Sequence, residues 1–404
     1  MPLAVWVLGF AIFAQGTSEF LLAGLLEPMA RDLHVTVPAA GLLISAYAVG
    51  MVVGAPVLAM ATLRWPRRRA ALLFLAVFAA THVVGALTPG YGVLFASRVV
   101  GAVAYAGFFG VALVASMDLV PADRRARAIA IVVGGITVAT VFGVPAGTLI
   151  GQYLGWRAAF WAVAALTVPA FAGVALTLPN ARPGEKPTPR VREELRSMAR
   201  PALWVAYGTT ALSFSSMMAT FGYLGPLLTG PSGLAERWVP IVLALFGVGC
   251  LIGITIGGRL ADAHTFATLY IGLAGVALAS AGIALSVSHP VAVIVLVFLM
   301  GVAGMATNPA VNVRIQATAG PARSLAGASV TSAFNVGNTA APWLGGLVLN
   351  AGLGYGAVPW VGVAMAAGAL GTVLWASALD RRQNATSPPV AGVALEPAAT
   401  MAVD

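Results

Sequence analysis

The chain has 404 residues, of which 59% are apolar and only 9% are charged, and its mean hydropathy is +0.92. This composition excludes an ordinary soluble domain and indicates an integral membrane protein. The formal net charge of +9 does not indicate a nucleic-acid partner, because the basic residues are spread along the chain and form no stripe.

Apolar runs long enough to cross a bilayer as helices, which takes about 20 residues, recur along nearly the whole chain. The first run lacks a basic segment before it and many others follow, so we interpret it as a retained helix and not as a cleaved signal peptide. We expect twelve spans in all, over residues 4–28, 40–62, 70–88, 92–119, 128–150, 158–178, 202–228, 238–258, 266–287, 290–312, 324–350 and 356–378.

The basic residues predict the orientation of these spans. With the N-terminus inside, 18 of the 22 Lys and Arg residues face the cytoplasm, since only Arg31, Arg157 and Arg237 fall outside and Arg98 lies within a helix. Positive loops resist translocation, so both termini are predicted to be cytoplasmic. The near absence of Lys relative to Arg fits a bacterial source, and we expect the protein in the bacterial plasma (inner) membrane.

No signature of an enzyme is present. The single cysteine, Cys250, lies in an apolar run and is interpreted as a small buried side chain. The histidines show no metal-ligand spacing, and there is no Walker loop and no nucleophile elbow. We therefore expect no metal, no cofactor and no use of ATP.

One long charged connection divides the chain into two six-span halves. Motifs of the first half recur about 200 residues later, as "GAPVLAMATLR" from Gly54 and "GITIGGRLAD" from Gly253. Repeated halves in the same orientation predict a binding site between them. The expected organisation is an N-terminal half over 1–178, a cytoplasmic linker over 179–200, a C-terminal half over 201–384 and a disordered tail over 385–404.

Small residues four apart form ridges on several predicted helices, and such ridges let helix backbones approach closely in lipid. One hypothesis is that these ridges are the contacts on which the two halves rock; the alternative is that Gly is simply frequent here. The ridges comprise Gly143, Gly147, Gly151 and Gly155; Gly249, Gly253 and Gly257; Ala46, Gly50 and Gly54; and Gly337, Ala341 and Gly345.

Several motifs together resemble the major facilitator superfamily, specifically its twelve-helix drug:proton antiporters. "GVPAGTLIG" followed by "GWRAAFW" looks like the antiporter motif, in which Pro145 kinks the fifth helix. "LFASRVVGAVAYAG" looks like the motif with an intramembrane arginine, here Arg98, and "RWPRRR" looks like the Arg-rich loop after the second helix. That loop departs from the family pattern at Leu63 and Pro66, whereas the second copy keeps its acid at Asp262.

The resemblance implies a major facilitator fold of two pseudo-symmetric six-helix halves. The run from "GTSEFLLAGLLEP" onward is similar to actinobacterial chloramphenicol exporters and to the neighbouring sugar-efflux branch. It implies a monomer that exchanges a small-molecule drug for protons across the lipid bilayer, with no nucleic-acid partner.

The acid in "GTSEF", Glu19, lies within the first span, where an ionisable group costs roughly 2.5–3.5 kcal/mol and indicates a function by default. At about 1.5 Å per residue, Glu19 and Arg98 reach similar depths near the outer boundary. We interpret Glu19 as a proton carrier or as an acid that competes with the substrate, tuned by Arg98; the alternative is a static salt bridge.

Other polar and aromatic residues carry weaker hypotheses. Asp118 is expected to latch Arg67 or Arg68 on the cytoplasmic side or to be solvated there, and His82 is interpreted as a packing residue. Interhelical hydrogen bonding is the alternative for the polar residues of the second half. The residues expected to line an apolar substrate cavity are Tyr47, Phe108, Phe214, Asn308 and Asn335.

The predicted function is a proton-coupled antiporter that exports a small, mostly apolar antibiotic, with chloramphenicol as the first candidate. A sugar or metabolite exporter of the same fold is the first alternative. A membrane receptor or scaffold that does not transport is the second, and a mid-membrane acid argues against it.

Overall fold

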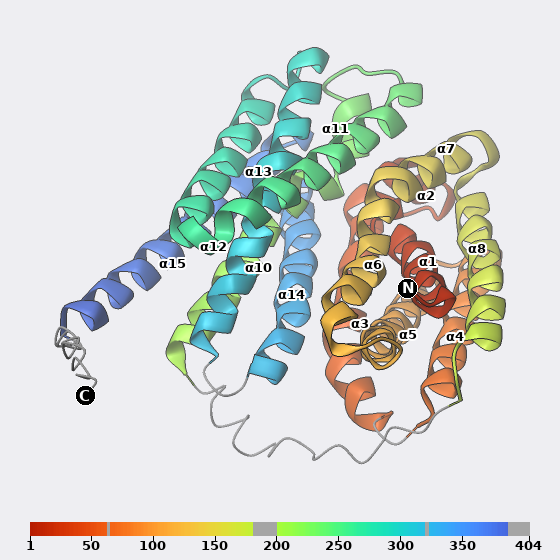
Figure 1. Cartoon of the computed structure of the whole chain (residues 1–404). Coiled ribbons are helices and arrows are strands. Elements are labelled where there is room, and N and C mark those ends of the chain that lie inside the picture. The colour runs from red at the N-terminus through yellow and green to blue at the C-terminus, as the bar shows by residue number, and fades with distance from the viewer. Residues whose placement is uncertain (63–64, 181–199, 320–322, 387–404) are drawn as a thin grey trace, which may run out of the picture.

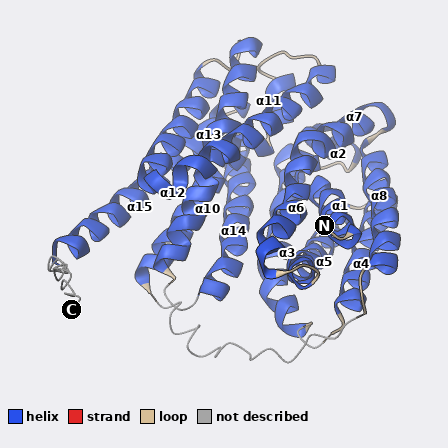
Figure 2. Cartoon of the chain, in the orientation of Figure 1, coloured by secondary structure: helices blue, strands red, loops and turns tan. Residues whose placement is uncertain are grey.

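The structure is a computed structural model that describes residues 1–62, 65–180, 200–319 and 323–386, without the side chains of 59–60, 262, 323–328 and 381–386. The described residues are helical, with no strand among them (Figure 2). The central part of the predicted linker and nearly all of the predicted tail lie outside these residues.

The first half contains six membrane-length helices joined by short turns (Figure 1). The 3-10 turn and short helix α2 that follow α1 interrupt what the apolar pattern predicts as one span over 4–28. The elements are α1 (Leu3–Phe20), η1 (Leu21–Gly24), α2 (Leu26–Asp32), α3 (Val37–Ala61), α4 (Arg67–Leu87), α5 (Tyr91–Asp118), η2 (Ala122–Arg124), α6 (Arg125–Val138), η3 (Ala139–Gly143), α7 (Val144–Leu154) and α8 (Trp156–Thr177).

The second half repeats this plan. Its two predicted spans over 238–258 and 266–287 form one element, α12, whose backbone is non-helical at His264 (φ −138°, ψ 51°), so that two legs meet at a kink. The elements are α10 (Pro201–Gly222), α11 (Leu224–Thr229), η4 (Glu236–Trp238), α12 (Val239–Leu285), α13 (Pro290–Thr318), α14 (Arg323–Asn350), η6 (Tyr355–Ala357) and α15 (Val358–Thr386).

Ten segments of the described residues are long and apolar enough to cross a membrane. The other two long helices, α10 and α14, stand at the seventh and eleventh predicted spans and carry more polar residues, among them Ser213, Ser216 and Asn335. The chain is thus an all-α multi-pass membrane protein with two six-helix halves.

A π-helical turn, η3, precedes Pro145 in the fifth membrane helix. Proline has no N–H group to donate to the carbonyl four residues before it, and a widened turn is one way in which a helix accommodates that loss. The irregularity therefore lies beside the glycines of this helix, at the position where the sequence predicts a kink.

The two halves meet mainly where α3 packs on α14 and where α7 with η3 packs on α12, and α11 also contacts η1 and α2. We call the side of the molecule at which α8 ends and α10 begins the linker side, and the opposite side, at which α2, α7 and α11 lie, the far side (Figure 1). Hydrogen bonds between the halves join Ser45, within α3, to the main-chain oxygen of Thr339, within α14, and join Gln152 of α7 to the main-chain oxygen of Glu236 on the far side. The separation of α14 from the first half widens toward the linker side in the same view.

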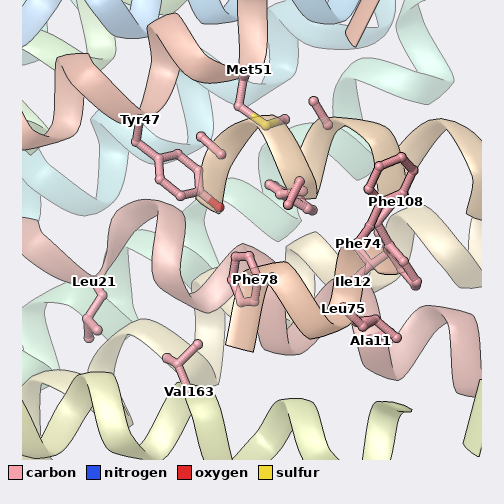
Figure 3. Packing of buried hydrophobic residues seen from close by; sticks show 14 of the residues in the cluster. Ala11, Ile12, Leu21, Tyr47, Met51, Phe74, Leu75, Phe78, Phe108 and Val163 are labelled. Atoms are coloured by element: carbon pink, nitrogen blue, oxygen red, sulfur yellow. The ribbon is translucent and has the colours of Figure 1, made fainter. Parts of the chain in front are cut away.

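Buried apolar side chains form a core inside each half and a further cluster across the far-side contact. In the first half, Phe74, Phe78 and Phe108 belong to one such core (Figure 3). The cluster between the halves joins Ala23 and Val144 of the first half to residues of the second half, including Phe221, Leu243 and Phe246. Apolar burial therefore holds the far side together.

Candidate functional site

The end of α1 brings two polar residues to the boundary between the halves. Ser18 and Glu19 are buried, with 1% and 8% of their surfaces exposed. The amide Nδ2 of Asn338, on α14 of the second half, donates to Oε1 of Glu19 at 3.4 Å. The predicted carboxylate therefore lies within a candidate membrane span, Leu3–Gly24, and contacts the opposite half directly.

Arg98 of α5 binds the residue beside Glu19. Its Nη1 donates to the Ser18 hydroxyl at 2.7 Å, and its Nη2 donates to the Ser18 main-chain oxygen at 3.0 Å. The guanidinium carbon lies 4.1 Å from the centre of the Tyr47 ring, a cation–π contact. Among the described residues, Glu19 has no ion pair within 4.0 Å. Arg98 is thus near the carboxylate without being its salt-bridge partner in this conformation.

His82 of α4 completes this network. Its Nδ1 lies 2.8 Å from the main-chain oxygen of Phe78, which can only accept, so Nδ1 carries a proton. Its Nε2 lies 2.7 Å from the Ser18 hydroxyl, which already accepts from Arg98 and is therefore free to donate. The bonds run from Arg98 through Ser18 to a neutral His82. The imidazole packs against Phe78 and Phe160 and also orients Arg98 through Ser18, a role that the sequence did not predict.

Two of the residues predicted to line a substrate cavity lie inside the first half. Tyr47 is 1% exposed, its ring centre is 6.3 Å from that of Tyr105, and its hydroxyl has no hydrogen-bond partner. Phe108 is fully buried in the apolar core (Figure 3). Tyr47 therefore borders the Arg98 network, whereas Phe108 faces no open space here.

The other three lie in the second half. Phe214 of α10 makes an edge-to-face contact with Phe334 at 5.2 Å between ring centres. The side-chain and main-chain oxygens of Asn308 both accept from Asn312. Asn335 donates to Thr331 within α14, and its own side-chain oxygen is buried without a partner. Asn335 therefore offers a buried acceptor that is not used within the protein.

The glycine ridges pack inside each half, which corrects the hypothesis that they are the contacts between the halves. A Cβ atom added at Gly249, Gly253 or Gly257 would lie closer than 3.0 Å to the backbone of α13, at Phe298, Val302 and Ala306 respectively. Likewise, Gly143, Gly147 and Gly151 lie against Thr17, Leu21 and Leu25 of the first half. Four-residue spacing predicts a close helix contact but does not identify the neighbouring helix.

Other residues make the close approaches between the halves. An added Cβ at Gly247 of α12 would lie 2.8 Å from Val141 of η3, and one at Gly225 of α11 would lie 2.8 Å from the Ala23 carbonyl oxygen. The rings of Phe20 and Phe221 meet edge to face at 6.1 Å. A cavity of about 10 Å³, near the smallest that holds one water molecule, lies beside Phe20 and Asn338.

Charged pairs brace both ends of the halves. On the linker side, Arg67 lies 4.0 Å from Asp118. Arg68 is partly buried on the same helical turn as Arg67. The side chain of Asp262, the acid of the second copy of this motif, lies outside the described residues. On the far side, Asp32 accepts from Arg157 and from the indole N–H of Trp156.

The Arg157 hydrogen bond holds the pKa of the Asp32 carboxyl below its usual value, and the bond from Trp156 acts in the same direction. A further brace, a two-bond pair between Arg314 and Asp380 next to Phe266, was not predicted from the sequence. The pattern that predicts helices gives no information on which charged residues at their ends become neighbours.

No group of three or more His, Cys, Asp and Glu side chains among the described residues has the arrangement of a metal site. An apolar groove of about 560 Å³ lies between the two legs of α12 and α13. It is lined by residues such as Ile271 and Leu278, which are more than 70% exposed and therefore face outward from the bundle.

Comparison with known proteins gives consistent results. A family model described as Major Facilitator Superfamily matches residues 8–285 and 233–401. The chain is 43% identical over 352 residues to a chloramphenicol resistance protein of Streptomyces lividans, covering 87% of this chain and 90% of that protein. It is 35% identical over 363 residues to the inner membrane transport protein YdhP of Escherichia coli (strain K12), covering 90% and 93%. A crystal structure of a mutant peptide transporter POT matches with a TM-score of 0.76 over 95% of both chains; at 13% identity it supports the fold alone.

Proposed function

Since the chain belongs to the major facilitator superfamily of membrane transporters, we propose that it is a proton-coupled antiporter that exports a small, mostly apolar antibiotic. The observation that carries this proposal is Glu19, a buried carboxylate at the contact between the halves with no ion pair within 4.0 Å among the described residues. A carboxylate in such a place is expensive unless its charge changes during the cycle.

Glu19 and Arg98 have different roles in the proposed coupling: the charge of Glu19 changes and that of Arg98 does not. Arg cannot lose its proton under cellular conditions, so Arg98 supplies a constant positive charge. Its two bonds to Ser18 keep that charge beside Glu19 without neutralising the carboxylate by direct contact. Glu19 then remains available to take up a proton or to interact with a substrate, and competition between these two events is what exchange requires.

Chloramphenicol is the proposed substrate because the relative from Streptomyces lividans is a chloramphenicol resistance protein. Phe20, which follows Glu19 and meets Phe221 of the second half, and Tyr47, which lies under Arg98, would suit the aromatic ring of such a compound. Asn335, with its unpartnered oxygen, would accept a hydroxyl or amide hydrogen of the drug.

We further propose that the protein lies in the bacterial inner membrane with both termini in the cytoplasm, so that the linker side is cytoplasmic. The far-side contacts would then close the outside, and the conformation would admit substrate from the cytoplasm. The Arg67 and Asp118 pair would belong to the latch that closes the linker side when the far side opens. The glycine ridges would keep each half rigid while the halves rock.

Transport in proteoliposomes tests the proposal. If a neutral drug leaves as one proton enters, each cycle moves one charge, so one pH unit supplies about 1.4 kcal/mol and 100 mV about 2.3 kcal/mol. Chloramphenicol flux should respond to both forces, and an added hexose should not compete. Glu19→Gln should still bind drug but lose uphill transport. The control Glu27→Gln, at a partly exposed residue whose contact with the Thr229 hydroxyl an amide oxygen can also make, should transport normally.

Uphill transport with normal proton flux in Glu19→Gln would show that another group couples the two fluxes. Absence of any drug flux in the unmodified protein, with intact binding, would favour a receptor over a transporter.

A further inference from the structure

We propose that Asn338 of α14 detects the protonation state of Glu19, so that a proton on Glu19 stabilises the conformation in which the halves meet on the far side. This inference rests on the proposed proton coupling and adds a residue of the second half to it. It assigns to Asn338 the role of a positioning residue that joins the proton site to the movement of the halves.

The first observation is an incomplete hydrogen bond between the halves. Asn338 is 1% exposed, and its Nδ2 reaches Oε1 of Glu19 at 3.4 Å. Bonds to a charged carboxylate are usually about 2.7–2.9 Å long. The other end of the same amide, Oδ1, is buried without any partner. A buried acceptor with no donor is unfavourable. The contact between Asn338 and Glu19 would therefore be completed by one further hydrogen-bond donor that faces Oδ1 of Asn338.

The second observation is the arrangement of charge around Glu19. Arg98 is the nearby cation, and its Nη atoms are both bonded to Ser18. Tyr47 lies under the Arg98 guanidinium and beside Tyr105, and neutral His82 is linked to Ser18. From the second half, the group that faces Glu19 is the uncharged amide of Asn338. Titratable residues of the other helices packed on α1 lie at the ends of those helices: Arg125, Arg127, Tyr153 and Arg157.

One proton on Glu19 would complete the hydrogen bonding between Glu19 and Asn338 and would supply a donor to the unpartnered Oδ1 of Asn338. A protonated carboxyl group has one O–H donor and one carbonyl acceptor, and an asparagine amide has the complementary pair. The carboxyl O–H would donate to Oδ1 of Asn338 while Nδ2 of Asn338 donates to the carboxyl oxygen, which gives two parallel bonds across the boundary. The conclusion does not depend on how the amide oxygen and nitrogen are assigned, because either orientation offers one donor and one acceptor.

Without the proton, the carboxylate can accept from Asn338 but cannot donate to it, so only one bond joins the halves here. The second bond therefore exists only when Glu19 is protonated and the far side is closed. By linkage, proton binding and far-side closure then favour each other. A proton that enters from the far side would drive closure behind it, and its release toward the linker side would leave the site ready for substrate.

Distances between spin labels on the far side test this inference in the full-length protein in lipid nanodiscs. Thr36→Cys and Ala351→Cys place labels at exposed positions of the two halves, in a Cys250→Ala background that removes the native buried thiol. In otherwise unmodified protein, the ratio of closed to open far side should fall about tenfold between about pH 5 and about pH 9, since one hydrogen bond of about 1.4 kcal/mol corresponds to a factor of ten.

Two variants isolate the contact. Asn338→Leu should flatten this pH dependence, because it removes the acceptor of the proton and keeps a side chain of similar size. Glu19→Gln should keep the far side closed at every pH, because its amide can donate to Asn338 permanently. Thr339→Val, at the next residue of α14, removes a hydroxyl that donates to the main-chain oxygen of Asn335 within its own helix; it is the matched control and should retain the dependence of the unmodified protein.

The outcomes separate this inference from the proposed function. A normal pH dependence in Asn338→Leu would overturn the role of Asn338, even if proton-coupled drug export is demonstrated. Dependence on pH that is lost specifically in Asn338→Leu and Glu19→Gln would support it, even if the exported substrate is not chloramphenicol.

Discussion

Substitution of Ser18 by alanine should loosen the network that holds Arg98. The hydroxyl accepts from Arg98 at 2.7 Å and bonds to His82 at 2.7 Å, so its removal breaks two buried bonds at once. A neutral hydrogen bond between membrane helices contributes about 0.6 kcal/mol on average, and a bond to a charged group contributes about 1.5 kcal/mol or more. Their sum predicts a loss of about 2 kcal/mol in the free energy of unfolding.

The loss should stay near this value because Arg98 keeps its bond to the Ser18 main-chain oxygen and its contact with the Tyr47 ring. Export should also fall, because a guanidinium released from the hydroxyl is free to pair with Glu19 and draw it away from Asn338. The assays are unfolding in mild detergent and proton-driven drug flux.

A neighbouring serine provides the control for this prediction. The hydroxyl of Ser97 is also buried but donates only to Leu94 in its own helix, so Ser97→Ala should have little effect. Ser18→Thr keeps the hydroxyl and should retain more of the stability and flux than Ser18→Ala. Equal stability and equal flux in Ser18→Ala and Ser97→Ala would refute the role of this network.

Two further predictions concern packing and pH. Gly253→Ala should lower the free energy of unfolding by about 1 kcal/mol or more, because its Cβ would press on the Val302 backbone. Gly258→Ala, where nothing lies within 4 Å, should be neutral or stabilising. Thermal unfolding of both variants checks this, and equal effects would argue against tight packing of α12 on α13. The pKa of the Asp32 carboxyl is lowered in the folded protein, mainly by Arg157, so its contribution to stability is present above its usual pKa of about 3.9 and is lost as the pH falls through the lower folded-state value. Asp32→Asn should therefore be less stable than the unmodified protein at about pH 6, and the difference should shrink below about pH 3; a constant difference would contradict the assignment.

Some features of the site can be predicted from the sequence because they depend on position along a helix axis. An acid in an apolar run must lie at membrane depth, and the rise per residue gives Glu19 and Arg98 similar depths. The helix irregularity at Pro145 can be predicted for a similar reason, because the missing N–H group of proline disturbs only the helix that contains it. Such features require no knowledge of which helix lies next to which.

The partners of these residues could not be predicted in the same way. Ser18, His82 and Asn338 lie on three helices, and whether their side chains meet depends on the rotation and packing of each helix. The glycine ridges show the same limit, because a row of small residues indicates close packing on some helix, and Gly253 packs on Val302 within its own half.

The sequence by itself determined that this chain is a multi-pass membrane protein with an acid in its first apolar run, and its motifs resembled a transporter family with two six-helix halves. Composition and span length suffice for the membrane class, because the bilayer imposes them on any chain that crosses it, whereas the transporter class rested on the resemblance. Only the tertiary structure decided that Arg98 binds Ser18 while Glu19 faces Asn338 across the boundary of the halves. The reason is that contacts between helices depend on facing and register, which lipid does not constrain and which side-chain packing selects.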